Sequence, residues 1–475
     1  MKRTKKILIA NSIGVDDNGN NFILFPSRWS ASVGKTKSFN YYPYELAYLS
    51  SLLKKKTNHK IRMVDGNLEK LTWKEYFKKY SNFKPDYLVM ETSSAVYKYD
   101  LMFALSFKKK YGTKIIFCGQ HPTAYPLEVK KGGADFVCVG EYEMTVLDII
   151  EGKKNVLGLY PNKRRPLINL DELPNPEDDD IKRVDYMNIG GSNYREVELF
   201  PTRGCPMNCV FCVARQLYYD QPNFRKRSIN NVIEEIKYIS NKYSQVEGFF
   251  FDEENHNADK KYVLDLCKAI IKNKLNNYHY EAMCGYWTID EEMLDVMKQA
   301  GYYKLRIGIE TASVKTSKGM VKNINIDKLV GVLEMAKKYG IKMYGTFTFG
   351  APESNKEEDN KTLLLIEKLL KEDLLEDFQA SICTPQPGTP FFQYLEKNKY
   401  LLTKNWEDYS ATKAVYEYPD YKKTDIESNI KQVARIYFRH MLRKNGALKL
   451  IIDQIRKDGV ETTFKKAFSM LNNFK

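Results

Sequence analysis

Long apolar runs are absent from this chain of 475 residues. A membrane-spanning helix needs about 20 consecutive apolar residues, and no stretch of the sequence approaches that length. The basic start, Met1 to Lys6, resembles the charged region of a signal peptide, but the apolar run Ile7 to Ala10 is too short and ends at Asn11. The sequence therefore predicts a cytoplasmic protein without a membrane span.

Cysteine and histidine are scarce, with eight and five residues. In a long chain with no secretion signal, these cysteines do not predict a disulfide framework. Only three of them lie close together in the sequence, and four others lie in or beside apolar runs, where a thiol acts as a small buried hydrophobe. These four are Cys118, Cys138, Cys267 and Cys383.

An excess of basic residues, 75 against 60 acidic ones, gives a formal net charge of +15. Such a charge can serve nucleic acid, an anionic membrane or anionic substrates. A dedicated nucleic-acid binder clusters its charge on one face or tract, whereas here the basic residues are spread from end to end. The charge alone therefore does not favour a nucleic-acid partner.

The first 150 residues repeat one pattern, a short apolar run followed by a turn and a longer amphipathic stretch. Strands that are apolar on both faces need helices on both sides, so the pattern predicts an α/β fold with a doubly wound parallel sheet. Ligands of such sheets lie beyond the carboxyl ends of the strands. The predicted strands are 6–10, 60–65, 86–90, 114–118 and 135–139.

An acidic segment follows this region. Residues 171–180 contain six carboxylates and two prolines, a composition that opposes both helix and sheet. We expect residues 151–195 to form a solvated linker, with a metal site as the alternative.

Strand and helix patterns alternate again over residues 196–400. Six βα units predict a partial (β/α)6 TIM-type barrel, whose mouth is wider than that of a closed eight-strand barrel and can admit a large cofactor. Residues 401–475 predict a small helical cap, with a helix capped by Thr424. The domains predicted are thus 1–150, 151–195, 196–400 and 401–475, and the barrel strands are 197–203, 248–252, 279–284, 304–309, 343–349 and 378–383.

The strongest chemical motif is Pro201-Thr-Arg-Gly-Cys205-Pro-Met-Asn-Cys209-Val-Phe-Cys212. Thiolates at these spacings can converge on one side of a compact loop. A structural zinc site needs four ligands, whereas an iron–sulfur cluster held by three thiolates leaves one iron free for a substrate or cofactor. The zinc alternative would need a fourth ligand from elsewhere: Cys284, Cys267 or His256.

These cysteines reproduce the CxxxCxxC motif of the radical SAM superfamily, whose members bind a [4Fe-4S] cluster and S-adenosylmethionine (SAM). Later segments also resemble that superfamily, in the right order over about 200 residues: Phe250-Phe-Asp-Glu-Glu254, Gly308-Ile-Glu-Thr311, Gly345 to Glu353 and Pro385 to Pro390. A carboxylate can pair with the ammonium group of SAM, and glycine lets the backbone approach the adenine. The resemblance implies that Cys205, Cys209 and Cys212 hold the cluster and that Asp252, Glu253, Glu310 and Gly350 bind SAM.

The first 150 residues resemble the cobalamin-binding domain of the B12-dependent branch of this superfamily, in Val64-Asp-Gly66, Pro85 to Val89, Gly119 to Ala124 and Gly140 to Glu143. The resemblance implies cobalamin contacts from Asp65, Gly119, His121, Gly140 and Glu141, and the hydroxyls of Thr92, Ser93 and Ser94 suit the nucleotide tail of cobalamin. Cys118-Gly119 stands where the branch usually has paired glycines. The DxHxxG cobalt-ligand signature is absent, so we expect no histidine on cobalt and a corrin or nucleotide-loop contact for His121.

The resemblance implies a cobalamin-dependent radical SAM methyltransferase. In such an enzyme a 5′-deoxyadenosyl radical takes hydrogen from an unactivated carbon of a small molecule, methylcobalamin supplies the methyl group, and a second SAM remethylates the cobalt. An external electron donor of the flavodoxin or ferredoxin type is then required. Three alternatives stay open: a ring-forming or oxidising B12-dependent radical enzyme, an RNA-modifying radical SAM enzyme, and a corrinoid carrier or sensor, against which the intact cysteine motif argues. The sequence indicates neither the substrate nor a catalytic acid or base.

Overall fold

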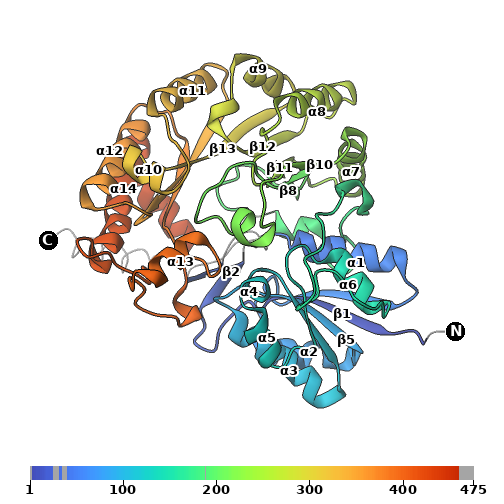
Figure 1. The fold of residues 1–475 in the computed structure, drawn as a ribbon. Coiled ribbons are helices and arrows are strands. Elements are labelled where there is room, and N and C mark those ends of the chain that lie inside the picture. Colours follow the sequence, from blue (N-terminus) through green and yellow to red (C-terminus); the bar gives the residue numbers. More distant parts are fainter. Residues whose placement is uncertain (1–2, 25–30, 35–39, 188, 459–475) are drawn as a thin grey trace.

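The structure is a computed structural model that describes residues 3–24, 31–34, 40–187 and 189–458. Two parallel sheets with helices on their faces dominate the chain (Figure 1). The smaller sheet is built from the N-terminal part, blue in Figure 1, and the larger from the middle of the chain, green to orange. The predicted α/β fold, a doubly wound sheet followed by a partial barrel and a helical C-terminal region, is confirmed.

The N-terminal sheet has five parallel strands in the order β4-β1-β5-β6-β7. The strand order reverses between β1 and β5, and in open α/β sheets ligands bind beyond the strand ends at such a switch point. The strands are β1 (Lys6–Asn11), β4 (Lys60–Asp65), β5 (Tyr87–Glu91), β6 (Lys114–Cys118) and β7 (Phe136–Val137).

Alternate residues of β1 pack against opposite helix layers. Ile7 and Ile9 belong to the hydrophobic core under α1 and α6, whereas Leu8 and Ala10 belong to the core under α2 and α3. Both faces of the sheet are therefore buried, which is why the strands are apolar throughout. The helices are α1 (Tyr44–Lys56), α2 (Trp73–Tyr80), α3 (Tyr97–Tyr111), α4 (Gln120–Ala124), α5 (Pro126–Lys131) and α6 (Glu143–Ile150).

An antiparallel hairpin, β2 (Asn21–Leu24) and β3 (Ala31–Gly34), lies between β1 and α1 in the sequence. The sequence pattern did not predict it.

The acidic linker is only partly solvated: Asp171, Glu172, Asp179 and Asp180 are exposed, but the expectation of a solvated connector was wrong for the other two acids. Glu177 and Asp178 are only 2% and 5% exposed. Lys54 of α1 lies 2.5 Å from Glu177, and Lys242, the last residue of α7 (Ile229–Lys242), lies 2.9 Å from Asp178. These lysines neutralise the two buried acids, which lets this part of the linker pack between α1 and α7.

The larger sheet has six parallel strands in the order β15-β14-β13-β12-β11-β8. The two edge strands, β8 and β15, do not pair with each other in the described part of the chain, so the barrel stays open. Its strands are β8 (Glu196–Leu199), β11 (Gly248–Phe251), β12 (His279–Cys284), β13 (Tyr302–Glu310), β14 (Lys342–Phe349) and β15 (Asp377–Ile382). Outside them lie α7 (Ile229–Lys242), α8 (Lys260–Lys272), α9 (Glu291–Gln299), α11 (Ile326–Lys338) and α12 (Lys356–Lys371) (Figure 1).

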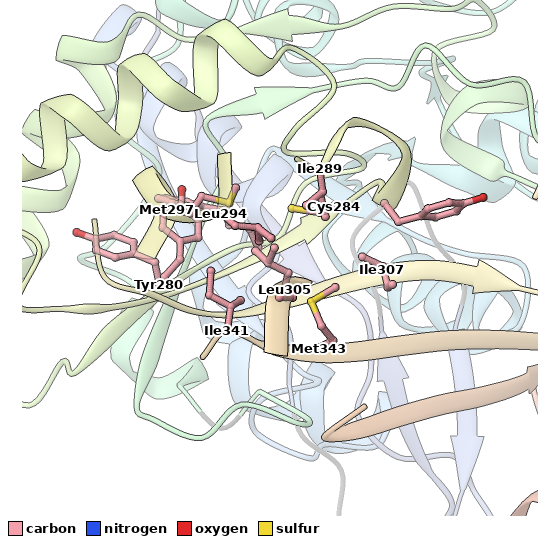
Figure 2. Close-up of a cluster of buried hydrophobic side chains, with 14 of the residues drawn as sticks. Tyr280, Cys284, Ile289, Leu294, Met297, Leu305, Ile307, Ile341 and Met343 are labelled. Carbon is pink, nitrogen blue, oxygen red and sulfur yellow. The ribbon is translucent and has the colours of Figure 1, made fainter. Parts of the chain in front are cut away.

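A hydrophobic layer joins these strands to their helices. Figure 2 shows Leu305 and Ile307 of β13 among side chains such as Leu294 and Met297 of α9. Because side chains alternate along a strand, Arg306 and Gly308 face the interior of the barrel instead. The outer layer supplies the apolar core, which leaves the interior available for polar groups.

Shorter elements surround the barrel mouth: β9 (Thr202–Arg203), β10 (Arg225–Lys226), a π-helix (Ala214–Tyr218) and α10 (Val314–Gly319). The C-terminal part contains α13 (Pro390–Lys397) and α14 (Lys423–Asp458), which packs against α12 and β15. The chain is already helical at Lys423, so Thr424 lies inside α14, and the prediction that it caps this helix was wrong. Of the helices in the described ranges, none combines the length and the apolar character that crossing a membrane requires.

Candidate functional site

Cys205, Cys209 and Cys212 line one cavity of about 320 Å³ inside the barrel. The cavity begins at the carboxyl ends of the strands, where Asp252 follows β11 and Glu310 ends β13, and it extends down to Arg306 and Tyr344. Ligand sites of barrel folds lie at this end of the strands. The structure therefore brings the cysteine motif and the predicted SAM-binding acids to one place.

The cysteine loop is fixed by its backbone. Gly204 has a φ of +98°, and a Cβ at this position would lie 1.9 Å from the side-chain oxygen of Asn223, so only glycine fits. The N–H of Val210 donates to the carbonyl of Met320 at 3.2 Å, and the carbonyl of Val210 accepts from Phe391 at 3.2 Å. The loop is thus held from both sides while its thiols face the cavity.

The three thiols suit a cluster better than a single metal ion. Burial raises the pKa of Cys205 to about 11 and that of Cys212 to about 12, so the thiols are neutral until a metal binds and displaces their protons. Within the described ranges, no three His, Cys, Asp or Glu side chains are arranged to hold one metal ion. A [4Fe-4S] cluster binds its thiolates through separate iron atoms, whereas a structural zinc ion needs four ligands at one point.

The three acidic side chains that follow β11 point to two different sides: two line the cavity and one does not. Asp252 and Glu254 line the cavity, and Glu254 accepts from the N–H of Gly204 at 2.9 Å. Glu253 is fully buried on the other side, where it accepts from the N–H of Thr202 at 2.6 Å and lies 2.5 Å from Nδ1 of His256. The structure thus places Asp252 where the sequence predicted it but puts Glu253 outside the cavity lining. Side chains alternate between the two faces of an extended segment, so Phe250, Asp252 and Glu254 share one face. Applied to the sequence, this alternation would have predicted Glu254 as the second acid of the cavity.

Glu310 forms an ion pair with Lys322, 2.8 Å from its Nζ, and both line the cavity beside the cysteines. Val321 and Asn323 have φ values of +56° and +54°, a conformation that residues other than glycine rarely adopt. Burial works to lower the pKa of Lys322, but the facing carboxylate of Glu310 outweighs it and raises the pKa, so Lys322 stays charged. Sequence reasoning missed this residue, since no motif it used includes Lys322.

Gly350, a predicted SAM contact, is not among the residues that line the cavity. Its φ is +73°, its N–H donates to Asp359 at 2.8 Å, and its carbonyl accepts from the hydroxyl of Tyr416 at 2.5 Å. A Cβ here would lie 2.6 Å from that hydroxyl. Gly350 therefore shapes the end of β14, while Thr346, Phe347 and Thr348 of the same strand line the cavity.

The deep end of the cavity combines aromatic rings with polar groups. The guanidinium of Arg306 lies 4.5 Å from the ring centre of Phe250 and 4.9 Å from that of Tyr344. Arg306 also pairs with the buried Glu281, and Tyr41 lines the same region. Aromatic walls with a few fixed polar groups are typical of sites for small organic molecules.

The carboxyl edge of the N-terminal sheet carries the predicted cobalamin residues. Asp65 is buried and accepts from Tyr186 at 2.6 Å and from the N–H of Asn67 at 2.8 Å, so it shapes its own loop. Thr92 donates to the buried Asp100 at 2.6 Å. Thr92 and Asp65 are thus held near the switch point between β1 and β5.

His121 is buried and held by several groups. Its ring stacks on Tyr97 at 4.3 Å, its Nδ1 lies 3.0 Å from the hydroxyl of Ser94, and its Nε2 lies 3.6 Å from Glu128. Gly119, before it, has a φ of +98°, and a Cβ there would lie 2.7 Å from Cγ of Glu91. Nε2 is buried and has no hydrogen-bond partner within the described residues, and the expectation that no histidine binds cobalt stays a prediction.

The two predicted cofactor regions meet at Gln120 and Gln386. Nε2 of Gln120 donates to Oε1 of Gln386 at 2.8 Å, and Gln386 lines the cavity that contains the cysteines. Three buried polar atoms at this boundary, Oε1 of Gln120, Nε2 of Gln386 and Oγ of Ser93, lack hydrogen-bond partners in the described part of the chain. Cobalamin carries amide side chains around its corrin ring, so atoms of this kind fit such a ligand.

Gly140 and Glu141 follow β7. The N–H of Gly140 donates to the hydroxyl of Thr123 at 3.1 Å. Glu141 is buried and pairs with Arg203 at 3.2 Å and with Arg225 at 2.9 Å. Glu141 thus contacts the cysteine-bearing region directly.

Comparison with known proteins agrees with this geometry. The model of the radical SAM superfamily matches residues 199–366, which include the three cysteines, Asp252 and Glu310. Residues 199–366 form a radical SAM domain. The resemblance seen in the sequence motifs is thereby confirmed. The chain is also 28% identical over 429 residues to an uncharacterized methyltransferase of Pyrococcus horikoshii, covering 86% of this chain and 90% of the relative.

Two solved structures share the fold beyond the radical SAM domain. The radical SAM methyltransferase TsrM of Kitasatospora setae, solved with tryptophan and a SAM analogue, has a TM-score of 0.65 at 14% identity and covers 84% of this chain and 77% of its own. The cobalamin-dependent SAM radical enzyme OxsB, solved with aqua-cobalamin and SAM, has a TM-score of 0.67 at 15% identity, covering 99% and 71%. At this identity the likeness concerns the fold, and it agrees with the predicted B12-dependent branch.

Proposed function

We propose that this radical SAM enzyme is a cobalamin-dependent methyltransferase that acts on an unactivated carbon of a small molecule. The observation that carries the proposal is the cavity shared by the three cysteines, Asp252 and Glu310, which meets the carboxyl edge of the N-terminal sheet at Gln386. Relatives named methyltransferases, and the fold of the B12-dependent branch, support the same function.

Each group of cavity residues has a role in this proposal. Cys205, Cys209 and Cys212 hold the cluster, and the carboxylates of Asp252 and Glu254 bind the ammonium group of SAM. Glu310, positioned by Lys322, accepts hydrogen bonds from the ribose. When bound, the cluster and SAM supply the radical that takes hydrogen from the substrate, and methylcobalamin supplies the methyl group.

The substrate binds at the deep end of the cavity, against Tyr41, Phe250 and Tyr344, with Arg306 fixed between two of these rings. Buried walls exclude water, which protects the substrate radical from side reactions. At the sheet edge, Ser93, Gln120 and the loop of Gly119 and His121 contact cobalamin. An external electron donor of the flavodoxin or ferredoxin type reduces the cluster, and the cytoplasm is the expected location.

The cluster assignment is tested first. Anaerobically reconstituted protein should show the charge-transfer absorption of one oxygen-sensitive [4Fe-4S] cluster, and replacing all three cysteines with Ala should abolish both this absorption and SAM cleavage. Unchanged iron content in that variant, or stoichiometric zinc in the native protein, would refute the assignment.

The reaction is tested with methyl-labelled SAM, cobalamin and a panel of small aromatic and heteroaromatic molecules. A methyltransferase should form S-adenosylhomocysteine and 5′-deoxyadenosine in equal amounts and place the label in the product. Substrate turnover with 5′-deoxyadenosine but without label in the product would replace the proposal with the ring-forming or oxidising alternative.

A further inference from the structure

Arg203 lies beside the barrel mouth, but its side chain forms hydrogen bonds with the N-terminal domain. It lies in β9, two residues before Cys205, and is 1% exposed. Its Nη1 donates to Glu143 at 2.7 Å and to Glu141 at 3.2 Å. Glu141 follows β7 and Glu143 begins α6, so both acids come from the N-terminal domain.

Aromatic rings complete the surroundings of this guanidinium. The ring centres of Tyr44 and Tyr48, both on α1, lie 5.2 Å from its central carbon. Arg225 of β10, the strand paired with β9, donates to Glu141 at 2.9 Å. The arginine that precedes the cysteine loop is therefore inserted into a pocket of the other domain.

Stability alone accounts poorly for this arrangement. Buried ion pairs stabilise little, because desolvation offsets their attraction, and apolar residues often replace them without loss. Here Nη2 of Arg203 and Oε2 of Glu143 also lack hydrogen-bond partners in the described ranges, and a partly satisfied buried network is costly. The network therefore points to a role in positioning.

Short connections lead from Arg203 to both predicted cofactor sites. Only Gly204 separates Arg203 from Cys205, and Gly204 is fixed by its φ of +98° and by its N–H bond to Glu254. In the other direction, Gly140 precedes Glu141 and donates to Thr123 of α4, the helix that contains His121. A displacement of Arg203 would thus reach the first cysteine directly.

We propose that Arg203 is a positioning residue that fixes the cysteine loop against Glu141 and Glu143 of the N-terminal domain. The geometry of the cluster ligands then depends on two acids of the N-terminal domain. The proposal rests on the proposed function in that it takes Cys205, Cys209 and Cys212 as the cluster ligands.

The full-length Arg203→Met variant tests the proposal, and Arg183→Met is its matched control. Arg183 is also 1% exposed and forms a buried ion pair, with Glu235, but its hydrogen bonds in the described part of the chain reach no residue of the loop 204–212. In apoprotein, amide hydrogen exchange of residues 204–212 should become about tenfold faster in Arg203→Met and change less than twofold in the control. In reconstituted protein, the electron paramagnetic resonance signal of the reduced cluster should lose its SAM-induced change only in Arg203→Met.

A second variant covers the case in which Arg203→Met does not fold. Glu143→Gln keeps the side-chain shape but removes one charge, and it should accelerate exchange of the loop in the same direction by a smaller factor, because Glu141 still pairs with Arg203. The proposal would be overturned if Arg203→Met and Glu143→Gln both showed the same loop exchange and the same cluster signals as the Arg183→Met control. If wild-type protein binds no cluster, the proposed function fails, while the exchange measurement on apoprotein still decides the role of Arg203.

Discussion

Gln120 and Gln386 join the N-terminal sheet to the barrel through one hydrogen bond of 2.8 Å between their amide groups, and each keeps one buried atom without a partner in the described ranges. A buried amide atom without a partner is costly, so a ligand that supplies the missing bonds should bind tightly there. This pair is therefore the point at which cobalamin contact can be tested most directly.

Replacing Gln120 with Ala should weaken hydroxocobalamin binding by about tenfold, the effect of losing one or two buried hydrogen bonds. Absorbance titration of the apoprotein measures the dissociation constant. Gln393→Ala, which removes an exposed amide on α13, is the control and should leave the constant unchanged. Equal affinities of all three proteins would exclude Gln120 from the cobalamin site.

Asp252 and Glu253 should separate in their effects. Asp252→Asn should weaken SAM binding by about tenfold, because a charge-assisted hydrogen bond to the ammonium group is lost. Glu253→Gln should leave SAM affinity within twofold and instead lower the free energy of unfolding, since Glu253 bonds to Thr202 and His256 behind the cavity. Equilibrium binding of SAM to the reconstituted protein and urea denaturation measure the two effects. A larger loss of SAM affinity in Glu253→Gln than in Asp252→Asn would contradict the placement of these side chains.

Lys322→Met should lower the free energy of unfolding by about 2 kcal/mol, because it removes the ion-pair partner of the half-buried Glu310. The double variant Lys322→Met with Glu310→Gln should recover part of this loss, since no unpaired charge then remains. A double-mutant cycle in urea denaturation gives the coupling energy. Additive effects of the two substitutions would show that the ion pair contributes nothing to stability.

Asp100 should make stability depend on pH. Burial raises its pKa to about 7, although the hydroxyls of Ser12 and Thr92 donate to it and oppose the shift. The folded state therefore holds a proton that the unfolded chain releases above about pH 4, so the free energy of unfolding falls as pH rises toward 7.

The variant Asp100→Asn removes this titration. Between pH 5 and pH 7 the wild type should lose about 2 kcal/mol more stability than the variant, because the slope of about 1.4 kcal/mol per pH unit falls to half as pH reaches the pKa of about 7. Urea denaturation at both pH values measures the difference. Asp86→Asn is the control, because Asp86 is a half-exposed acid that also accepts a hydrogen bond and directly precedes β5. Parallel pH profiles of wild type and Asp100→Asn would contradict the raised pKa.

The strands and their order along the chain were predictable because the evidence for them is local. Runs such as Lys114–Cys118 are apolar on both faces, and the structure places strands at or near the predicted positions. The predicted strand 197–203, however, divides into β8 and β9, and the predicted strand 135–139 shortens to β7. The cysteine motif is also a local pattern, so the spacing of its residues is enough to identify them. The β2–β3 hairpin was missed because each strand has only four residues, too few to show a strand period in the sequence.

The sequence by itself determined the two α/β domains and the cysteines that share a loop, because strand periodicity and motif spacing act between neighbouring residues. Only the tertiary structure decided which partners the charged residues find. Glu141 meets Arg203, Glu177 meets Lys54 and Glu310 meets Lys322 through contacts between segments that are separate in the chain. A buried charge requires a partner, but its identity depends on which elements pack together, and residue spacing does not specify that packing.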